Sequence, residues 1–423
     1  MIYRTYFFLT LVTISTLVYS QSNTSSPYSR YGLGDLVIKG LGQNLAMGGT
    51  TTGIRSSYHL NIGNPASYTA FDSLSFVFEN GISGRNTEYK TNSLNQKTNK
   101  LNYSYIAFGF PVSSRWSIGV ALFPYSSVGY SIETDSACYS AGDTVNTKKY
   151  YNGDGGLNQL IIGTSYELSE HLSLGVNASY LFGSLDYSSE IDFLNSSGAV
   201  DENTYNLEYI NKIIVNDFTL SYGIQYYNKI NSTEYTLGLT FDNRNKINAF
   251  RNLLVQRTNK YVLDTLTYID DKKDYIVLPT CIGAGFSLKT DWLLFAVDYS
   301  MQNWSESTFL GNKDSLANSN RLSVGLQLLP DDRSFNNYLK RIRYRIGGHY
   351  SNTYLDLRGE QLKDYSISFG LGFPIRRTRT SLNISFEAGR MGTTDNNLIM
   401  ENYGIIHVNL SLHDFWFIRR KFD

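Results

Sequence analysis

The eight residues Ser366-Ile-Ser-Phe-Gly-Leu-Gly-Phe373 decide the fold. In an extended chain, successive side chains point to opposite faces, so the apolar residues of this stretch share one face and the small or polar residues share the other. A strand of a transmembrane β-barrel has this pattern, with its apolar face toward lipid and its other face toward the interior. The alternation recurs in 322–328, 382–388 and 406–412. The sequence therefore predicts membrane-spanning strands.

Alternating segments continue from residue 73 to the C-terminus, and about fourteen can be counted. An even number suits a bacterial single-chain barrel. The predicted strands lie at about 73–85, 100–110, 115–129, 158–168, 171–186, 206–228, 232–243, 274–289, 292–304, 320–330, 340–355, 363–373, 380–391 and 403–417.

The connections between these segments alternate between short and long. Tight turns are expected at 112–114, 169–170 and Lys229, and long loops at 130–157, 187–205 and 243–273. Outer-membrane barrels have short periplasmic turns and long external loops, so both termini are expected in the periplasm. The connection from Pro330 to Leu339 is an exception, being a longer periplasmic turn. A soluble β-sandwich also has alternating strands, but it does not need opposite loop lengths at its two ends.

The composition agrees with an all-β membrane protein. The 423 residues include 37 basic and 37 acidic side chains, so the net charge is zero and no basic surplus points to nucleic acid. Charged residues make up 17% of the chain and aromatic residues 14%. The mean hydropathy of −0.26 is too low for a bundle of membrane helices.

Residues 1–20 have the features of a signal peptide. Arg4 gives a positive start, 6–18 are mostly apolar, and the small residue Ser20 suits cleavage before Gln21. The apolar run is shorter than a spanning helix needs. Only Cys138 and Cys281 occur, too few for a disulfide framework, and whether they pair stays open.

Residues 31–70 are dense in glycine and have no clear periodicity. Glycine allows backbone to pass close to a wall and to adopt positive φ, as a plug inside a lumen requires. A phosphate-binding loop is the rival interpretation, but no Gly-Lys-Ser/Thr follows. We therefore expect a hatch at 21–70 and a barrel at 71–423.

Two groups of motifs resemble known outer-membrane proteins. Tyr31-Gly-Leu-Gly-Asp35, Ala46-Met-Gly-Gly49 and Asn64-Pro-Ala66 resemble the N-terminal hatch of FadL-type barrels. The ending from His413 to Asp423 resembles the terminal strand and basic tail of Bacteroidetes barrels, including the PorV-like relatives.

The resemblance implies a barrel plugged by its N-terminal hatch, with Gly48, Gly49, Asn64 and Pro65 as hatch residues. It implies passage of small hydrophobic or amphipathic molecules across the outer membrane. Related barrels also serve as accessory subunits of secretion or barrel-assembly machines, so an accessory or scaffold role is the alternative. Expected partners are outer-membrane lipid, the assembly machinery during biogenesis and other outer-membrane proteins, with no nucleic acid.

Pro124 lies near the outer end of the third predicted strand. Proline cannot donate to a strand ladder and could open a gap in the wall. In FadL-type barrels a kink in the third strand forms a lateral exit, so the resemblance makes Pro124 the candidate for such a gate. The alternative is that Pro124 only marks where the strand leaves the sheet.

Side-chain alternation places a set of charges in the lumen, where they avoid the cost of facing lipid. Hatch residues could pair with them, namely Arg30, Asp35, Lys39 and Arg55. The predicted lumen charges are Glu79, Arg85, Asp298, Arg321, Arg343, Arg345, His349 and Glu387.

The terminal strand from Gly404 carries an aromatic signal at Phe415, Trp416 and Phe417, which should close the barrel and be recognised during assembly. No catalytic residue, cofactor or metal site is predicted, because the five histidines show no metalloprotease spacing and no nucleophile elbow accompanies a triad. Acidic runs at 152–156 and 270–274 could bind a divalent cation but are more typical of solvated turns.

Overall fold

A computed structural model describes residues 23–140, 143–195, 197–311, 316–334, 336–375 and 379–415. The signal peptide predicted at 1–20 lies outside these residues, as do Trp416 and Phe417. Within the described chain, no helix has the length and apolarity needed to cross a membrane.

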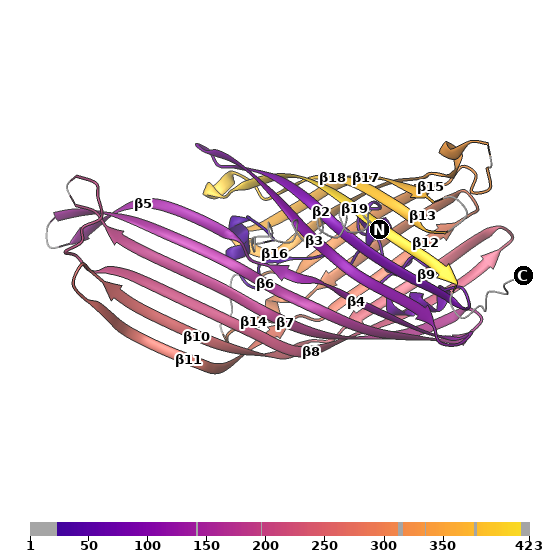
Figure 1. Ribbon diagram of the computed structural model, residues 1–423, viewed down its shortest axis with the longest axis horizontal. Coiled ribbons are helices and arrows are strands. Elements are labelled where there is room, and N and C mark those ends of the chain that lie inside the picture. The colour runs from indigo at the N-terminus through magenta and orange to yellow at the C-terminus, as the bar shows by residue number, and fades with distance from the viewer. Residues whose placement is uncertain are drawn as a thin grey trace, which may run out of the picture.

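The protein is a closed antiparallel β-barrel (Figure 1). All its strands belong to one sheet, and the ring closes where the last strand pairs with the first long one, from Met400↔Lys90 to Phe415↔Ser75. The strands are β1 (Asp35–Leu36), β2 (Ser75–Lys90), β3 (Asn95–Pro111), β4 (Trp116–Ser127), β5 (Tyr130–Ser140), β6 (Asp143–Ser169), β7 (Leu172–Phe193), β8 (Asn206–Ile230), β9 (Thr233–Asp242), β10 (Asn245–Thr258), β11 (Leu263–Leu278), β12 (Cys281–Lys289), β13 (Leu293–Gln302), β14 (Thr308–Phe309), β15 (Ser319–Leu328), β16 (Arg343–Leu357), β17 (Glu360–Pro374), β18 (Ser381–Met391) and β19 (Met400–Phe415).

The prediction of about fourteen strands is confirmed, because the ring has fourteen members. Three members are each divided by a short break in the ladder: β4 continues as β5, β9 as β10, and β11 as β12. The two-residue strands β1 and β14 add to the sheet locally and are not members of the ring.

The predicted alternation of faces is seen in β17. Ile367 and Phe369 are 68% and 49% exposed on the outside, whereas Ser366 and Ser368 are 6% and 1% exposed on the inside. Apolar side chains on the outside and polar ones inside are what a lipid-embedded wall requires. We call the end of the barrel with the β6–β7 and β8–β9 connections the turn end, and the opposite end the extended end.

Two of the three long loops predicted at the extended end, 130–157 and 243–273, are wrong, because most of their residues form strands. The third, predicted at 187–205, is shorter than expected, since β7 runs on to Phe193 and β8 begins only at Asn206. Residues 130–157 and 243–273 belong largely to β5, β6, β10 and β11. Together with β7 and β8, these strands form a sheet that extends beyond the rest of the ring at the extended end, on the left of Figure 1. We call it the high wall. Its two faces are not divided between lipid and lumen, so the alternation that marks the other strands is weaker here.

Short helices account for the remaining regular structure. They are η1 (Pro27–Arg30), α2 (Gly42–Leu45), η2 (Pro65–Ala70), η3 (Trp304–Glu306), η4 (Tyr338–Arg341) and η5 (Asp395–Asn397). Residues 24–72, called the N-terminal segment below, contain the first three. The segment contacts strands around the whole ring, from Glu79 of β2 through Asp298 of β13 to Ser368 of β17, and so lies inside it. The connection after Pro330 contains η4.

Candidate functional site

A belt of glycines on the inner wall carries the N-terminal segment. A Cβ built at each of these positions would meet atoms of the segment; at Gly325 it would lie 2.6 Å from the Cβ of Met47. Because these positions have no side chain, the backbone of the segment can approach the backbone of the wall. The belt consists of one glycine from each of ten strands: Gly109, Gly119, Gly163, Gly175, Gly223, Gly238, Gly285, Gly325, Gly347 and Gly370.

The four residues named as hatch residues lie in the buried part of the segment. Gly48 and Gly49 have φ of +69° and +83°, a region that other residues rarely adopt. The Gly48 amide donates to Ser368 Oγ over 3.0 Å. Asn64 caps η2 by accepting from the Ala66 amide at 3.1 Å, and Pro65 is the first residue of that helix.

Charged side chains of the wall hold the backbone of the segment. Asp298 Oδ2 accepts from the amides of Thr51 and Thr52 at 2.5 and 2.7 Å, and Arg321 donates to the Gly48 carbonyl at 3.2 Å. Such charge-assisted bonds are stronger than neutral ones. The Asp298 bonds therefore tie the loop 51–52 to β13.

The remaining predicted lumen charges bond mainly to the wall itself. Arg345 donates to Gln327 and Asn383, and the Arg343 guanidinium stacks 4.8 Å above the ring of Tyr58 in the segment. All the predicted lumen charges on β13 and β16–β18 are buried. Arg85 lies 3.8 Å from Glu401, a carboxylate of β19 that the sequence interpretation did not single out.

In the described chain, Arg30, Lys39 and Arg55 form no ion pair with the named wall charges, whereas Asp35 interacts electrostatically with Arg85. Lys39 pairs instead with Asp242 over 2.7 Å, and Arg55 stacks over Tyr227 and donates to Gln225. A contact that was missed joins His59 to Glu79 at 3.0 Å. Glu79 also accepts from the Leu60 amide, so this carboxylate does hold the segment.

His349, Ser366 and Asp364 form a chain that has the residue types of a hydrolytic triad. Ser366 Oγ lies 2.8 Å from His349 Nδ1, and His349 Nε2 lies 3.0 Å from Asp364. The Ser366 hydroxyl also lies within hydrogen-bond distance of Glu387 Oε1, to which it donates over 2.8 Å. His349, Ser366, Asp364 and Glu387 thus form one hydrogen-bonded network, which includes two predicted lumen charges.

The wall is interrupted beside Pro124. The ladder between β3 and β4 runs from Pro111↔Ser117 only to Ile106↔Leu122, and Pro124 follows two residues later. Beyond it, β4 pairs with β1 through Asp35↔Ser127 and Leu36↔Ser126. The N-terminal segment thus takes the place of β3 at this edge.

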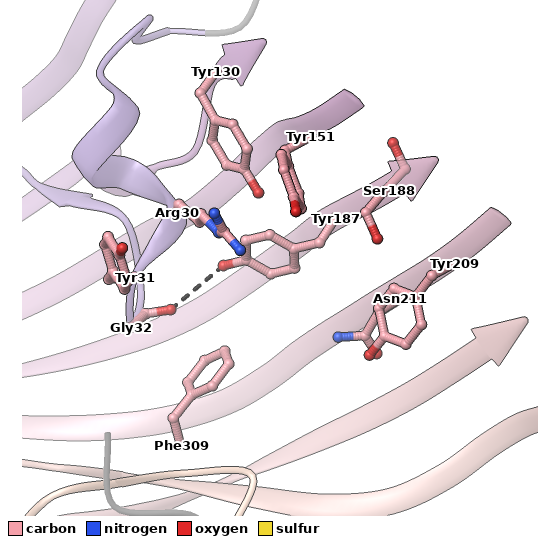
Figure 2. A pocket seen from close by; sticks show the side chains of 11 residues that line it. Arg30, Tyr31, Gly32, Tyr130, Tyr151, Tyr187, Ser188, Tyr209, Asn211 and Phe309 are labelled. Atoms are coloured by element: carbon pink, nitrogen blue, oxygen red, sulfur yellow. Dashed lines mark hydrogen bonds between the residues drawn. The ribbon is translucent and has the colours of Figure 1, made fainter. Parts of the chain in front are cut away.

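A pocket of about 290 Å³ opens at the extended end, on the inner face of the high wall (Figure 2). Arg30 points into it among tyrosine rings, 4.6 Å above the ring of Tyr151. Burial raises the pKa of Tyr130 to about 12, so its hydroxyl stays protonated. We call this site the tyrosine pocket; its lining is Arg30, Tyr31, Gly32, Tyr130, Tyr151, Tyr187, Ser188, Ser189, Tyr209, Asn211 and Phe309.

Arg251 sets the polarity of one side of this pocket. Its Nε donates to Asn211 Oδ1 at 2.9 Å, and its Nη2 donates to the hydroxyl of Tyr209 at 3.2 Å. Arginine has no acceptor, so the Asn211 oxygen must face Arg251 and the amide NH₂ faces the pocket, as Figure 2 shows. The pocket therefore presents donors and a guanidinium.

The tyrosine pocket was not predicted, because much of its wall, including Tyr130, Tyr151 and Tyr187, lies in segments predicted as loops. The signal that could have revealed it is the spacing of two between Tyr187 and Ser189 and between Tyr209 and Asn211, which is that of a strand face. A smaller pocket of about 60 Å³ lies at the turn end, between Arg55 and Tyr58 of the segment and Trp292.

The other predicted features have simpler outcomes. The described chain contains no group of three or more histidine, cysteine or acidic side chains arranged to hold a metal, and the runs 152–156 and 270–274 lie in β6 and β11. Cys281 is free, and the side chain of Cys138 is outside the described residues. Phe415 ends β19 opposite Ser75 and is 47% exposed.

Solved structures with the same fold are FadL-type barrels. The monoaromatic hydrocarbon channel CymD is 14% identical with a TM-score of 0.56, covering 89% of this chain and 98% of that chain. The Ralstonia pickettii toluene transporter TbuX is 13% identical with a TM-score of 0.54, covering 88% and 98%. A FadL homologue of Pseudomonas aeruginosa is 13% identical with a TM-score of 0.56, covering 90% and 99%.

These likenesses confirm the FadL-type fold. The comparison with curated proteins found no match. The model of the BamG family matches residues 1–423, the whole length of the sequence. This chain, a FadL-type barrel with its N-terminal segment seated on a belt of glycines, therefore belongs to the BamG family.

Proposed function

We propose that this chain is an outer-membrane barrel that passes small hydrophobic or amphipathic molecules, with the turn end in the periplasm and the N-terminal segment as its hatch. The observation that carries the proposal is the interruption beside Pro124, where the ladder between β3 and β4 stops at Leu122 and β1 occupies the free edge. A two-residue strand is held by few hydrogen bonds, so it can leave this edge more readily than a wall strand can.

The residues of the N-terminal segment that line the tyrosine pocket are close in sequence to those that pair with β4 at the interruption. Tyr31 and Gly32 line the pocket, and Gly34 touches the backbone of Ser127 at the edge of β4. A molecule bound in the pocket would reach the membrane through the wall once β1 is released. Pro124 lies at this point of β4, where it is paired with Asn158 of β6 and has no amide hydrogen to donate to a ladder.

A reversible disulfide between β1 and β4 tests this path. In a background with Cys138→Ser and Cys281→Ser, we would introduce Leu36→Cys and Ser126→Cys, which are directly paired in the antiparallel ladder. Paired Cα atoms in such a ladder lie about 4.5–5.5 Å apart, within the range that a disulfide bridges. Oxidation should abolish uptake of radiolabelled toluene by expressing cells, and reduction should restore it.

A control disulfide at Leu371→Cys and Ile384→Cys, paired between β17 and β18, should leave uptake unchanged. Equal uptake by the oxidised and reduced β1–β4 variant would contradict this path. Absence of uptake above that of cells without the barrel, in the reduced variant and the unmodified protein, would contradict transport itself.

The high wall favours a second function, that of an accessory or scaffold subunit in an outer-membrane complex. Tyr261, Leu263 and Tyr268 on the β10–β11 hairpin are 75%, 65% and 66% exposed. Among the described strands, residues 263–274 of β11 pair only with β10, so their other edge is open. Exposed apolar side chains on an open edge are typical of interaction sites.

Purification in mild detergent tests the second function. A stable set of partner proteins that is lost in the Tyr261→Lys, Tyr268→Lys variant would support a scaffold. Recovery of the barrel alone, together with toluene uptake that the β1–β4 disulfide blocks, would favour transport.

A further inference from the structure

The charge and shape of the tyrosine pocket indicate the chemistry of its ligand. The lining residues include a guanidinium, five tyrosines, two serines and an asparagine, and no acidic residue. Arg30 is exposed, and its guanidinium lies over the ring of Tyr151. A guanidinium among hydrogen-bond donors attracts an anion, and its fork matches a carboxylate.

The apolar part of the lining is aromatic. Its rings come from Tyr31, Tyr130, Tyr151, Tyr187, Tyr209 and Phe309, and the lining contains no aliphatic side chain. A long acyl chain would place only apolar groups against the polar hydroxyls, amide and guanidinium of this lining. The faces of aromatic rings carry negative charge and attract the weakly positive C–H groups of a saturated ring. Hydroxyls around that ring can pair with the phenols, serines and amide.

We infer that the tyrosine pocket binds an acidic sugar, with its carboxylate on Arg30 and its ring against the tyrosines. The Asn211 amide and the Tyr209 hydroxyl add two donors on the opposite side, and Arg251 fixes their direction. The volume of about 290 Å³ is at the lower end for small-molecule sites and suits one sugar residue. The inference rests on the first proposed function only in that both assign a role to the tyrosine pocket. Binding of a sugar to this pocket can be measured whether or not the barrel transports any molecule.

The chain offers a matched control for Arg30. The guanidinium of Arg257 lies 4.7 Å above the ring of Tyr205, a similar arrangement, but it pairs with Asp264 and lies outside the pocket. Replacing each arginine by glutamine therefore removes the same kind of contact inside and outside the pocket.

The experiment is calorimetric titration of the full detergent-solubilised barrel with sodium glucuronate, galacturonate and N-acetylneuraminate, and with glucose, benzoate and decanoate for comparison. We expect at least one acidic sugar to bind, and glucose, benzoate and decanoate to bind at least about tenfold more weakly. Arg30→Gln should reduce affinity for that sugar by about tenfold to a hundredfold, as loss of a charged hydrogen bond does. Arg257→Gln should not change it.

Heat-modifiable migration on a gel checks that each variant is folded, and Arg30→Lys, which keeps the charge, should retain part of the affinity. The inference is overturned if no acidic sugar binds, if benzoate or decanoate binds more tightly, or if folded Arg30→Gln binds as the unmodified protein does. Because toluene uptake is not measured here, failure of this inference and failure of the transport proposal are separate results.

Discussion

Replacing Gly325 with alanine should unseat the N-terminal segment while leaving strand β15 intact. The new Cβ would lie 2.6 Å from the Cβ and 2.7 Å from the carbonyl oxygen of Met47. Carbon atoms in contact are usually about 3.5–4.0 Å apart, so the segment would have to move by about 1 Å. Gly325 does not have positive φ, so alanine introduces no backbone strain.

The magnitude follows from the cost of overpacking. An extra methyl group in a well-packed site usually costs about 1–3 kcal/mol. If this cost falls on the seated state, the equilibrium between seated and unseated segment shifts by about fivefold to 150-fold. Because an unfilled barrel of this width leaves an aqueous hole, the time-averaged ion conductance should rise.

Conductance of purified protein in planar bilayers measures this shift. Gly404→Ala is the control, because its Cβ would find its nearest neighbour, in Phe386, at an ordinary 3.7 Å. We expect the conductance of Gly325→Ala to lie between that of the control and that of a protein lacking residues 31–66. If deletion raises conductance and Gly325→Ala behaves as the control does, the belt does not hold the segment in place.

Four further outcomes are expected. Deleting residues 31–66 should leave an inserted but leaky barrel with greater sensitivity to large antibiotics; unchanged conductance would mean that wall side chains close the lumen. Asp298→Ala should destabilise the seated segment by about 1–3 kcal/mol, because two backbone amides lose a charged acceptor, and faster proteolysis within 24–72 would report this. Arg345→Gln should raise conductance less than Asp298→Ala does, because Arg345 bonds to wall residues. Deleting residues 412–423 should abolish membrane insertion, since it removes the end of the strand that closes the ring; normal membrane extraction of this truncated protein would place the signal elsewhere.

The strands of the barrel could be predicted wherever a strand separates lipid from lumen. Ile367 and Ser366 differ in polarity because they face different surroundings, and the sequence records that difference. The same rule failed for β5, β10 and β11, where the high wall stands outside the lipid-facing part of the ring.

The candidate site was only partly predictable for a related reason. Gly48 and Asn64 belong to short motifs with local signals, whereas the tyrosine pocket combines Arg30 with residues more than a hundred positions later in the chain. The contact between Arg30 and these strand residues depends on the position of the N-terminal segment inside the barrel. No local sequence pattern specifies that position. The ion pair between Lys39 and Asp242 was missed for the same reason.

The high wall extends on only one side of the barrel, and this separates the tyrosine pocket from the open edge of β11. A ligand and a partner protein would therefore not compete for the same surface. The tyrosine pocket lies on its inner face, and the open edge of β11 lies at its side, with Tyr268 level with Ser188 through Leu254 and Ile210. A protein docked along that edge would stand beside the mouth and leave the pocket uncovered, and small molecules could still approach over the lower rim formed by β15–β19 (Figure 1). The two proposed functions therefore do not exclude each other.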